Sequence, residues 1–321
     1  MELTEDSLLT AVRKVLSGAG PEVVVPVGDD AAVVRPGSGD LILTTDALVE
    51  GRHFDRSLST AREVGYKAIA VNVSDVAAMA GSPRHALCAL TLSDEVDASW
   101  AMELFGGMRE ACEEFVCTLV GGNLARGSEV SVVVAMTGEV APGRAVTRSG
   151  AHAGDVLVVT GELGGAAAGL RLARLGAPQG RAWTDEERDA IHRLGRPTPR
   201  LGEAQVLARC GATAMIDISD GLTLDLSRLC AASGVGVRLE RDRVPVQLAA
   251  TSDEGLGGGE DYELLATLPT DDAVARAAEE LRSTFGTPLT AIGEIAEDGL
   301  VAVFTGGEER PLEPEGWDHF A

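Results

Sequence analysis

The chain has 321 residues and a formal net charge of −23, with 45% hydrophobic but only 3% aromatic residues. This length allows a sizeable apolar core in one large domain or two medium-sized ones, while so acidic a surface repels nucleic acid and anionic membranes, so neither is expected as a partner. The five cysteines form no Cys-x-x-Cys pair and no apolar run reaches membrane-spanning length, so we expect a soluble, cytoplasmic protein with reduced thiols.

The first part of the chain alternates between helical and strand-like patterns. Helices are predicted over residues 4–17, 60–80 and 97–115, the second of them rich in small residues and therefore buried. Apolar runs typical of strands lie at 22–27, 31–35, 41–45, 86–92, 116–120 and 130–138. This order predicts a mixed α/β domain whose strands return to one sheet.

A domain boundary is expected where Pro142-Gly143 breaks the pattern, and we divide the chain into domains 1–140 and 141–321. The second domain is predicted to contain a strand at Val156–Thr160, a helix from about 164, one helix within 176–199, a strand at 213–218, a helix at 222–233, and strands at 235–240 and 262–268. The fold class is therefore α/β, with two α/β domains.

Two common nucleotide-binding motifs are missing. Lys14 and Lys67 are the only lysines and no Gly-Lys pair occurs, which excludes a P-loop kinase. The sequence contains no Gly-x-Gly-x-x-Gly, so a dinucleotide site has no support.

Carboxylates occur instead where the local pattern predicts none. Asp29 and Asp30 lie between two apolar runs, and Asp46 follows a third. A tight turn or a helix cap would explain either site alone. Asp75 is the only charged residue between Lys67 and Arg84, and an unpaired carboxylate in a buried helix costs several kcal/mol. A metal ion or a buried arginine would compensate it, and we favour the metal ion.

Two further acidic segments lie in the second domain. Asp217 and Ser219 share a parity at the end of a strand and are expected to point the same way, Asp220 precedes a helix, and Glu260 follows three glycines. Helix capping would explain Asp220, and a glycine turn would explain the glycines. Taken together, the five segments offer hard oxygen ligands, which select Mg²⁺ or Ca²⁺, and no His-rich set accompanies them to favour zinc or iron.

These segments resemble the thiamine-monophosphate kinase family in order and spacing, within the aminoimidazole-ribonucleotide-synthetase-like superfamily. The matching stretches are Gly28–Ala32, Thr44–Asp46, Glu50–Phe54, Asn72–Met79, Asp217–Leu222, Gly258–Leu264 and Gly316–Phe320. The resemblance covers almost the whole chain. It implies a two-domain synthetase-like fold, with an N-terminal ATP- and metal-binding domain that joins its sheet to that of a second copy in a homodimer.

The resemblance also implies a reaction, the ATP-dependent phosphorylation of thiamine monophosphate to thiamine diphosphate by direct in-line transfer with several Mg²⁺ ions. No general base is expected, because the accepting phosphate oxygen is already deprotonated. Carried over by position, Mg²⁺ would be bound by Asp30, Thr44, Thr45, Asp46, Asp75, Asn123, Asp217 and Asp220; ATP would contact Phe105, Gly121, Gly122, Arg148 and Ser219; thiamine monophosphate would contact His53, Glu260 and Trp317.

Asn123 departs from the family pattern, which has Asp after the paired glycines. Asn retains an oxygen donor but loses the charge. Two alternatives therefore stay open: another ATP-using enzyme of the same superfamily, and a non-catalytic nucleotide-binding protein disabled at Asn123.

Overall fold

The computed structural model describes residues 10–12, 14–15, 20–27, 31–176 and 182–317. Internal contacts divide the chain into two units, one of Met1–Val76 with Ser82–Gly143 and the other of Ala77–Gly81 with Arg144–Ala321. The second division, after Gly143, lies close to the boundary that the sequence suggests at 140. Most of the helix expected over 4–17 lies outside the described residues, although residues 10–12, 14 and 15 are helical.

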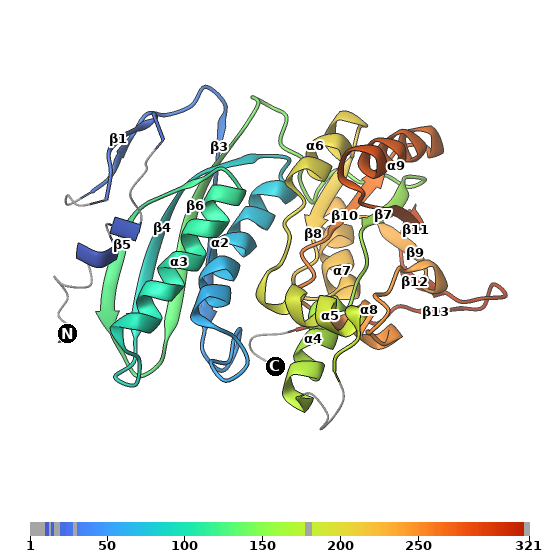
Figure 1. The fold of residues 1–321 in the computed structure, drawn as a ribbon. Helices are drawn as coiled ribbons and strands as arrows, with labels where there is room; N and C mark the ends of the chain where they lie inside the picture. Colours follow the sequence, from blue (N-terminus) through green and yellow to red (C-terminus); the bar gives the residue numbers. More distant parts are fainter. Residues whose placement is uncertain (1–9, 13, 16–19, 28–30, 177–181, 318–321) are drawn as a thin grey trace. The chain divides into compact units, whose positions relative to one another are not determined.

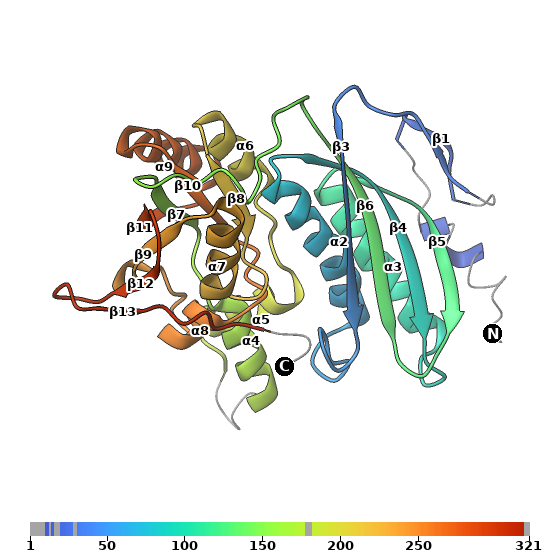
Figure 2. The ribbon, with the colours of Figure 1, turned by 180° about the vertical axis from the view of Figure 1, so that it is seen from behind.

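The first unit is built on a sheet covered by helices on one face. Within the described residues, four strands form this sheet in the order β3-β6-β4-β5, with α2 and α3 on the same side of it (Figures 1 and 2). The bounds are β3 Asp40–Val49, α2 Ala61–Ala78, β4 Ser82–Leu92, α3 Ala98–Glu114, β5 Thr118–Arg126 and β6 Ser131–Val140. The hairpin of β1 (Val23–Val25) and β2 (Val33–Val34) pairs only with itself among these strands, so the first two apolar runs do not join the sheet as expected.

The two helices of the first unit approach each other closely at glycines. A Cβ at Gly65 would lie 1.9 Å from the carbonyl oxygen of Leu104, and one at Gly107 would lie 1.9 Å from that of Arg62. Any larger residue would therefore separate α2 from α3. This packing explains why the 60–80 segment is rich in small residues and is almost continuously buried.

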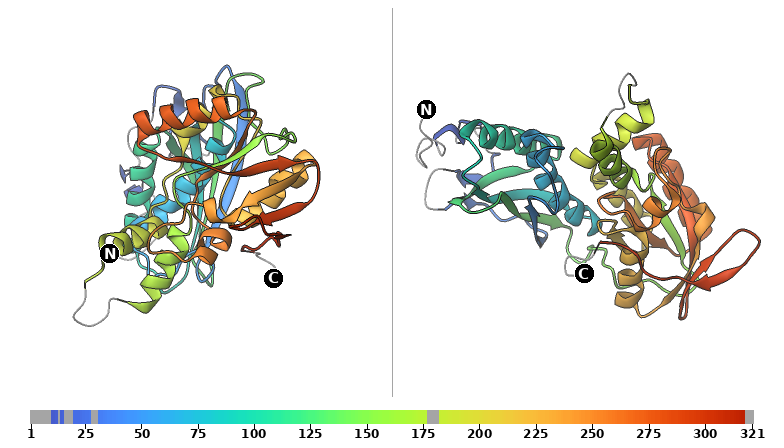
Figure 3. Two further views of the ribbon diagram at one scale, coloured as in Figure 1. Left: turned by 90° about the vertical axis from the view of Figure 1, so that its right-hand side faces the viewer. Right: turned by 90° about the horizontal axis from the view of Figure 1, so that it is seen from below.

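The opposite face of this sheet is open in the single chain. Burial alternates along β3, as expected for a strand covered on one side. Leu41 and Leu43 are 66% and 71% exposed, and Leu87 on β4 is 47% exposed. The end view in Figure 3 shows the helices on one side only.

In the second unit, the described residues form a seven-stranded sheet with helices on both faces, in the order β13-β12-β9-β11-β7-β10-β8. Its strands are β7 Val156–Thr160, β8 Ala214–Asp217, β9 Gly236–Glu240, β10 Leu264–Leu268, β11 Leu289–Ala296, β12 Leu300–Val303 and β13 Glu309–Pro311. Its helices are α4 Gly165–Leu175, α5 Asp185–Gly195, α6 Leu201–Arg209, α7 Leu222–Ser233, η1 Arg241–Arg243, α8 Ser252–Gly257 and α9 Asp271–Phe285.

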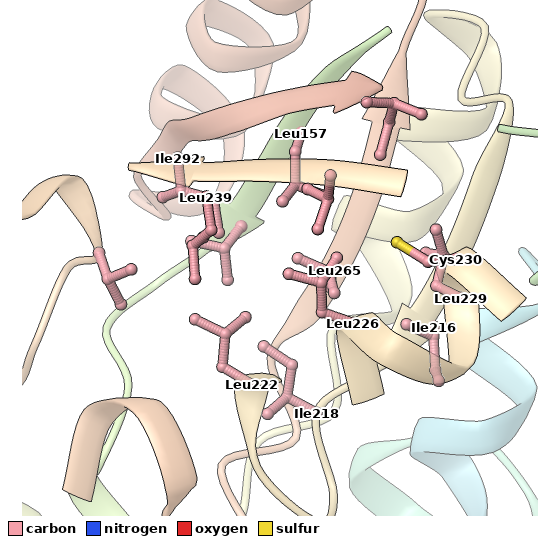
Figure 4. Close-up of a cluster of buried hydrophobic side chains, with 14 of the residues drawn as sticks. Leu157, Ile216, Ile218, Leu222, Leu226, Leu229, Cys230, Leu239, Leu265 and Ile292 are labelled. Carbon is pink, nitrogen blue, oxygen red and sulfur yellow. The ribbon is translucent and has the colours of Figure 1, made fainter. Parts of the chain in front are cut away.

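Successive residues of the central strands pack into two different hydrophobic clusters, one on each face of the sheet. Leu157 belongs to the cluster that α7 covers, shown in Figure 4, whereas its neighbour Val158 packs with α6 and α9. Leu265 and Ala266 divide in the same way. Burial on both faces explains why these strands read as continuous apolar runs, and it fixes the ends of β8 and β10 rigidly.

The C-terminal end of α2 and the residues that follow it belong to the second unit, since Ala77, Ala78 and Ala80 pack in the same cluster as residues of α6 and α9. No helix in the described ranges is long and apolar enough to cross a membrane.

Candidate active site

Thr44 and Asp75 meet on the helix-covered face of the first unit's sheet. The Thr44 hydroxyl donates a hydrogen bond of 2.5 Å to Asp75 Oδ2. Asp46 lies two residues further along β3, so the alternation of the strand places it on the same face as Thr44. The sequence suggests a carboxylate enclosed in a buried helix, but Asp75 is only half-buried. Its position at the helix surface allows contact with a ligand.

Thr45 and Asn123 lie on the open face instead. They line a cavity of 1340 Å³ together with Gly121 and Gly122. The Thr45 hydroxyl donates to the carbonyl oxygen of Val134 at 3.0 Å. The predicted metal ligands of this unit are therefore divided between two faces of one sheet, with Thr44, Asp46 and Asp75 on one face.

Gly122 has a structural reason to be glycine. A Cβ there would lie 1.8 Å from the carbonyl oxygen of Cys88, with which it pairs across β4 and β5. The close strand contact thus accounts for Gly122 without any ligand. Phe105, predicted near adenine, is 4% exposed within α3.

His53 is held in a defined orientation. Its Nδ1 accepts a 3.1 Å hydrogen bond from the Val49 N–H, so a neutral His53 carries its proton on Nε2. Lys67, 3% exposed on α2, donates from Nζ to the His53 carbonyl oxygen at 3.1 Å. The loop that carries His53 is therefore fixed to α2 by a buried ammonium group.

In the second unit, Asp217 ends β8, and Ser219 and Asp220 follow in the turn before α7. Because Ser219 lies beyond the strand, the expected shared strand parity with Asp217 does not apply. Asp225 Oδ2 accepts hydrogen bonds from the N–H groups of Ser219 and Asp220 at 3.1 and 3.0 Å. Arg228 Nη1 lies 2.6 Å from Asp220 Oδ2 and 2.6 Å from Asp225 Oδ1.

These contacts define the electrostatics of the turn. Burial raises the pKa of Asp225, against the opposing effects of the Asp220 N–H and Arg228. Asp220 does not cap α7, whose N-cap is Gly221. Its carboxylate is instead held by Arg228.

The Gly258–Tyr262 loop runs alongside this turn. The Glu260 N–H donates to the Ser219 carbonyl oxygen at 2.7 Å, and the Tyr262 N–H donates to that of Ile218 at 2.8 Å. Glu260 and Tyr262 both have a positive φ, of 70° and 52°. The loop therefore places Glu260 directly beside the Ser219–Asp220 turn.

The described C-terminal segment reaches the same turn. The Trp317 N–H donates to the Asp220 carbonyl oxygen at 2.9 Å, and the Trp317 residue is 45% exposed. Glu315 exchanges two hydrogen bonds of 2.9 Å with the Thr223 hydroxyl at the start of α7. Three segments distant in sequence thus bring Ser219, Asp220, Glu260 and Trp317 together. Arg148 is exposed on the strand-free segment before β7.

The donors fit magnesium chemically, although they do not form a closed cage. In the described part of the chain, no three of His, Cys, Asp and Glu are grouped so that they could hold a metal ion. Mg²⁺ commonly binds to one or two carboxylates and completes its shell with water and substrate phosphates. Asp46 with Asp75, and Asp217 with Asp220, supply oxygen donors of that kind. Asp30 lies outside the described residues.

The residues that hold these groups in place were not predicted from the sequence. Arg228 stands three and eight positions after the acids that it contacts, Asp225 and Asp220, and Asp261 follows Glu260 directly. The signal available was the spacing of Asp225 and Arg228 at i and i+3 on a helix that follows an acidic turn.

Family models match both units. The model of the AIR synthase related protein N-terminal domain matches residues 28–140, and that of the C-terminal domain matches residues 152–306. The thiamine-monophosphate kinase of Aquifex aeolicus is 36% identical over 99% of both chains. That of Salmonella typhimurium is 38% identical over 94% of this chain and 93% of its own.

Solved structures agree with these matches. A thiamine-monophosphate kinase from Stenotrophomonas maltophilia has a TM-score of 0.82 and 34% identity, over 96% of this chain and 98% of its own. A ThiL protein complexed with AMPPCP and TMP has a TM-score of 0.76 and 34% identity, over 100% and 99% of the two chains. The hydrogenase maturation protein HypE of E. coli has a TM-score of 0.79 but only 18% identity, over 98% of each chain, which shows a shared fold.

Proposed function

This chain belongs to the thiamine-monophosphate kinase family of AIR synthase related proteins, and from that premise we propose that it transfers the terminal phosphoryl group of ATP to thiamine monophosphate, forming thiamine diphosphate. The observation that carries the proposal is the match over 99% of both chains to a thiamine-monophosphate kinase. The 0.76 TM-score to a relative complexed with AMPPCP and TMP supports the same pair of substrates.

The chemistry requires two anions to meet. The acceptor oxygen belongs to a phosphate monoester and is deprotonated, so direct in-line attack on the γ-phosphorus needs no general base. Mg²⁺, when bound, would neutralise phosphate charge in the ground state and in the transition state. We assign Asp46, Asp75 and Thr44 in the first unit, and Asp217 and Asp220 in the second, as its protein ligands.

The remaining residues bind and orient the substrates. His53, whose Nδ1 is occupied by the Val49 N–H, would donate from Nε2–H to a phosphate oxygen of thiamine monophosphate. Glu260 and Trp317 flank the Asp220 turn, where a carboxylate and an exposed aromatic ring suit the cationic thiazolium of thiamine. Gly121, Gly122, Arg148 and Ser219 would contact ATP, and Phe105 would lie near the adenine.

We also propose that the enzyme is a cytoplasmic homodimer. Leu41, Leu43 and Leu87 are exposed apolar residues that line one cavity on the sheet face opposite α2 and α3. A second copy of that face would bury these leucines, which is favourable by about 25 cal/mol per Å² of apolar surface removed from water. All five cysteines are free thiols, as a reducing compartment requires.

Release of ADP in a coupled assay tests the reaction, with thiamine monophosphate and free thiamine as alternative acceptors. We expect kcat/KM to be at least about 100-fold higher for the monophosphate, because the free alcohol would need a base that the site lacks. Equal values for the two acceptors would refute the proposed acceptor. Binding of ATP without turnover on any acceptor would favour the non-catalytic alternative.

A further inference from the structure

The Gly258–Tyr262 loop contains an unusual conformation. Glu260 and Tyr262, which both carry side chains, have φ values of 70° and 52°. Non-glycine residues in this left-handed region cost on the order of 1–3 kcal/mol each, and they persist only where the surroundings hold them there. The loop therefore needs an anchor between these two residues.

Asp261 lies at that point. Its Oδ2 accepts a 2.7 Å hydrogen bond from the Gly164 N–H, and its Oδ1 accepts a 3.4 Å hydrogen bond from the Ala166 N–H. Both donors belong to the first turn of α4, where the helix N–H groups have no partner within the helix. Although Asp261 keeps some accessible surface as a residue, its carboxyl group is enclosed by protein, which raises its pKa to about 7.

The loop is held by hydrogen bonds to two different elements, α4 and the turn before α7. On the far side from α4, the Glu260 and Tyr262 N–H groups donate to the carbonyl oxygens of Ser219 and Ile218. Gly259 passes so close that a Cβ would lie 2.7 Å from the Ser219 carbonyl oxygen. The loop is thus held on one side by the Ser219–Asp220 turn and on the other by the hydrogen bonds from the start of α4 to Asp261.

We propose that Asp261 is a positioning residue for the kinase, which holds Glu260 in its strained conformation beside Asp220 by binding the N-terminus of α4. The proposal rests on the proposed function only for the role of Glu260 toward thiamine monophosphate. The burial of a carboxyl group is costly, and the charge of Arg193 together with the Gly164 and Ala166 N–H groups does not outweigh this cost. The retention of the Glu260 geometry gives that cost a function. Asp261 itself does not contact substrate.

The experiment compares Asp261→Ala and Asp261→Asn with Asp155→Ala. Asp155 is a matched control, because it is a 5% exposed carboxylate of the same unit that accepts hydrogen bonds from the His152 N–H and the Thr213 hydroxyl. It precedes β7 and does not contact the loop. Thermal unfolding, steady-state kinetics and amide hydrogen exchange are measured for all three variants and the wild type.

We expect Asp261→Ala to raise the KM for thiamine monophosphate at least about tenfold, because without its anchor the loop can leave a conformation that costs on the order of 1–3 kcal/mol per strained residue. The KM for ATP should change much less. Exchange at the Glu260 and Tyr262 amides should accelerate. Asp261→Asn keeps one acceptor oxygen and should show a smaller change in the same direction. Asp155→Ala should lower the Tm without changing either the KM or the exchange of the loop.

An unchanged KM and unchanged loop exchange in either Asp261 variant would overturn the proposal, and so would an equal effect of Asp155→Ala. Should Asp261→Ala not fold, Asp261→Asn decides by the same two measurements. If the wild type itself fails to phosphorylate thiamine monophosphate, the proposed function is refuted, while hydrogen exchange still decides whether Asp261 anchors the loop.

Discussion

Each carboxylate that we assign to magnesium and whose contacts are described is already engaged by the protein. The Thr44 hydroxyl donates to Asp75, and Arg228 forms an ion pair with Asp220. A divalent ion therefore competes with these internal partners for the carboxylates. Before the substrates bind, the same partners reduce the repulsion between the carboxylates. Because these partners are neutral or singly charged, a doubly charged ion near phosphate can displace or supplement them.

Asp75→Asn tests this arrangement in the first unit. The amide oxygen can still accept the Thr44 hydrogen bond, so we expect the Tm to stay within a few degrees of that of the wild type. The loss of a charged ligand should reduce kcat at least about 100-fold, equivalent to about 2.7 kcal/mol of transition-state stabilisation. Normal turnover by the variant would show that Asp75 does not bind metal.

The raised pKa of Asp261 predicts that the free energy of unfolding depends on pH. Its folded pKa of about 7 lies above the ordinary value of 3.8, because burial, aided by Glu263, outweighs the Gly164 and Ala166 N–H groups and Arg193. The folded state therefore binds a proton more tightly than the unfolded state, and stability falls as pH rises from about 4 to 7.

Urea unfolding at pH 5 and pH 8 measures this effect. Asp261→Asn lacks the titration, so its free energy of unfolding relative to the wild type should rise between the two values, by on the order of 1–3 kcal/mol. Asp94→Asn, at a side chain that is 98% exposed, is the control for the effect on stability of removing one negative charge. A difference independent of pH would contradict the prediction.

Asn123→Asp tests the departure from the family pattern. Asn123 faces the open side of the sheet, so an ion bound by Asn123 would occupy a different site from an ion held by Asp75. A restored charge should lower the magnesium concentration for half-maximal rate several-fold, since one charge in a screened site is worth on the order of a few kcal/mol at most. Superimposable magnesium titrations of the two proteins would place Asn123 outside any metal shell.

At the scale of elements, one buried ion network joins four segments of the second unit. Arg200, at the start of α6, donates to both carboxylate oxygens of Glu263 before β10, at 2.7 and 2.5 Å. The Thr160 hydroxyl at the end of β7 donates to Glu263 Oε2 at 2.7 Å. Arg200 also reaches Glu203, which accepts a further hydrogen bond from Thr287. Glu263 directly follows the Gly258–Tyr262 loop in the sequence, so the network fixes the C-terminal end of that loop.

Arg200→Met should therefore destabilise the protein strongly. It leaves Glu263, which is 1% exposed, without its cation, and loss of one partner from a buried pair costs about 3–5 kcal/mol. Denaturant unfolding gives the value. Arg209→Met, at an exposed ion pair with Glu280, should cost less than about 1 kcal/mol. Similar losses in the two variants would show that the network carries little stability.

The elements differ in how far sequence patterns could locate them. The α2, α3, β7 and α7 segments were predictable because periodicity and length agree with their burial. The pattern gave one helix over 176–199, which is α5, but α6 was missed because Pro197 and Pro199 precede it and its apolar face is short. The pairing of β1 with β2 alone could not be foreseen, because register depends on contacts that a run of valines does not specify.

At the scale of the whole molecule, the dimer proposal predicts the effect of one charge on assembly. Leu43→Lys places an ammonium group on the open sheet face, on the edge strand β3, and should convert the homodimer into a monomer at micromolar concentration, because an unpaired charge is costly to bury. Light scattering after size exclusion measures the mass. Leu248→Lys, at an 81% exposed residue of the second unit, is the control and should leave the mass unchanged. A monomeric wild type would refute the proposal.

Site residues were predictable from sequence to the extent that their acids interrupt apolar runs. Asp75 and Asp217 stood out for that reason, and Glu260 was suggested by its glycines. The partition of Thr44 and Thr45 onto opposite faces follows from strand alternation and could be predicted, but the backbone groups that Asp225 and Asp261 bind could not. Their function depends on backbone N–H groups brought close by the tertiary fold.

The C-terminal end of α2 belongs to a different unit from the rest of the helix. This constrains how the protein can fold during synthesis and how it can be cut into fragments. Val76 belongs to the first unit and Ala77–Gly81 to the second. As the polypeptide leaves the ribosome, this short stretch emerges with the first unit, yet part of its apolar surroundings, including Leu281, comes some 200 residues later. A gene cut after Gly143 would thus separate the second unit from Ala77, Ala78 and Ala80 of its own core. Chimeras that exchange the two halves between relatives must carry residues 77–81 with the C-terminal half.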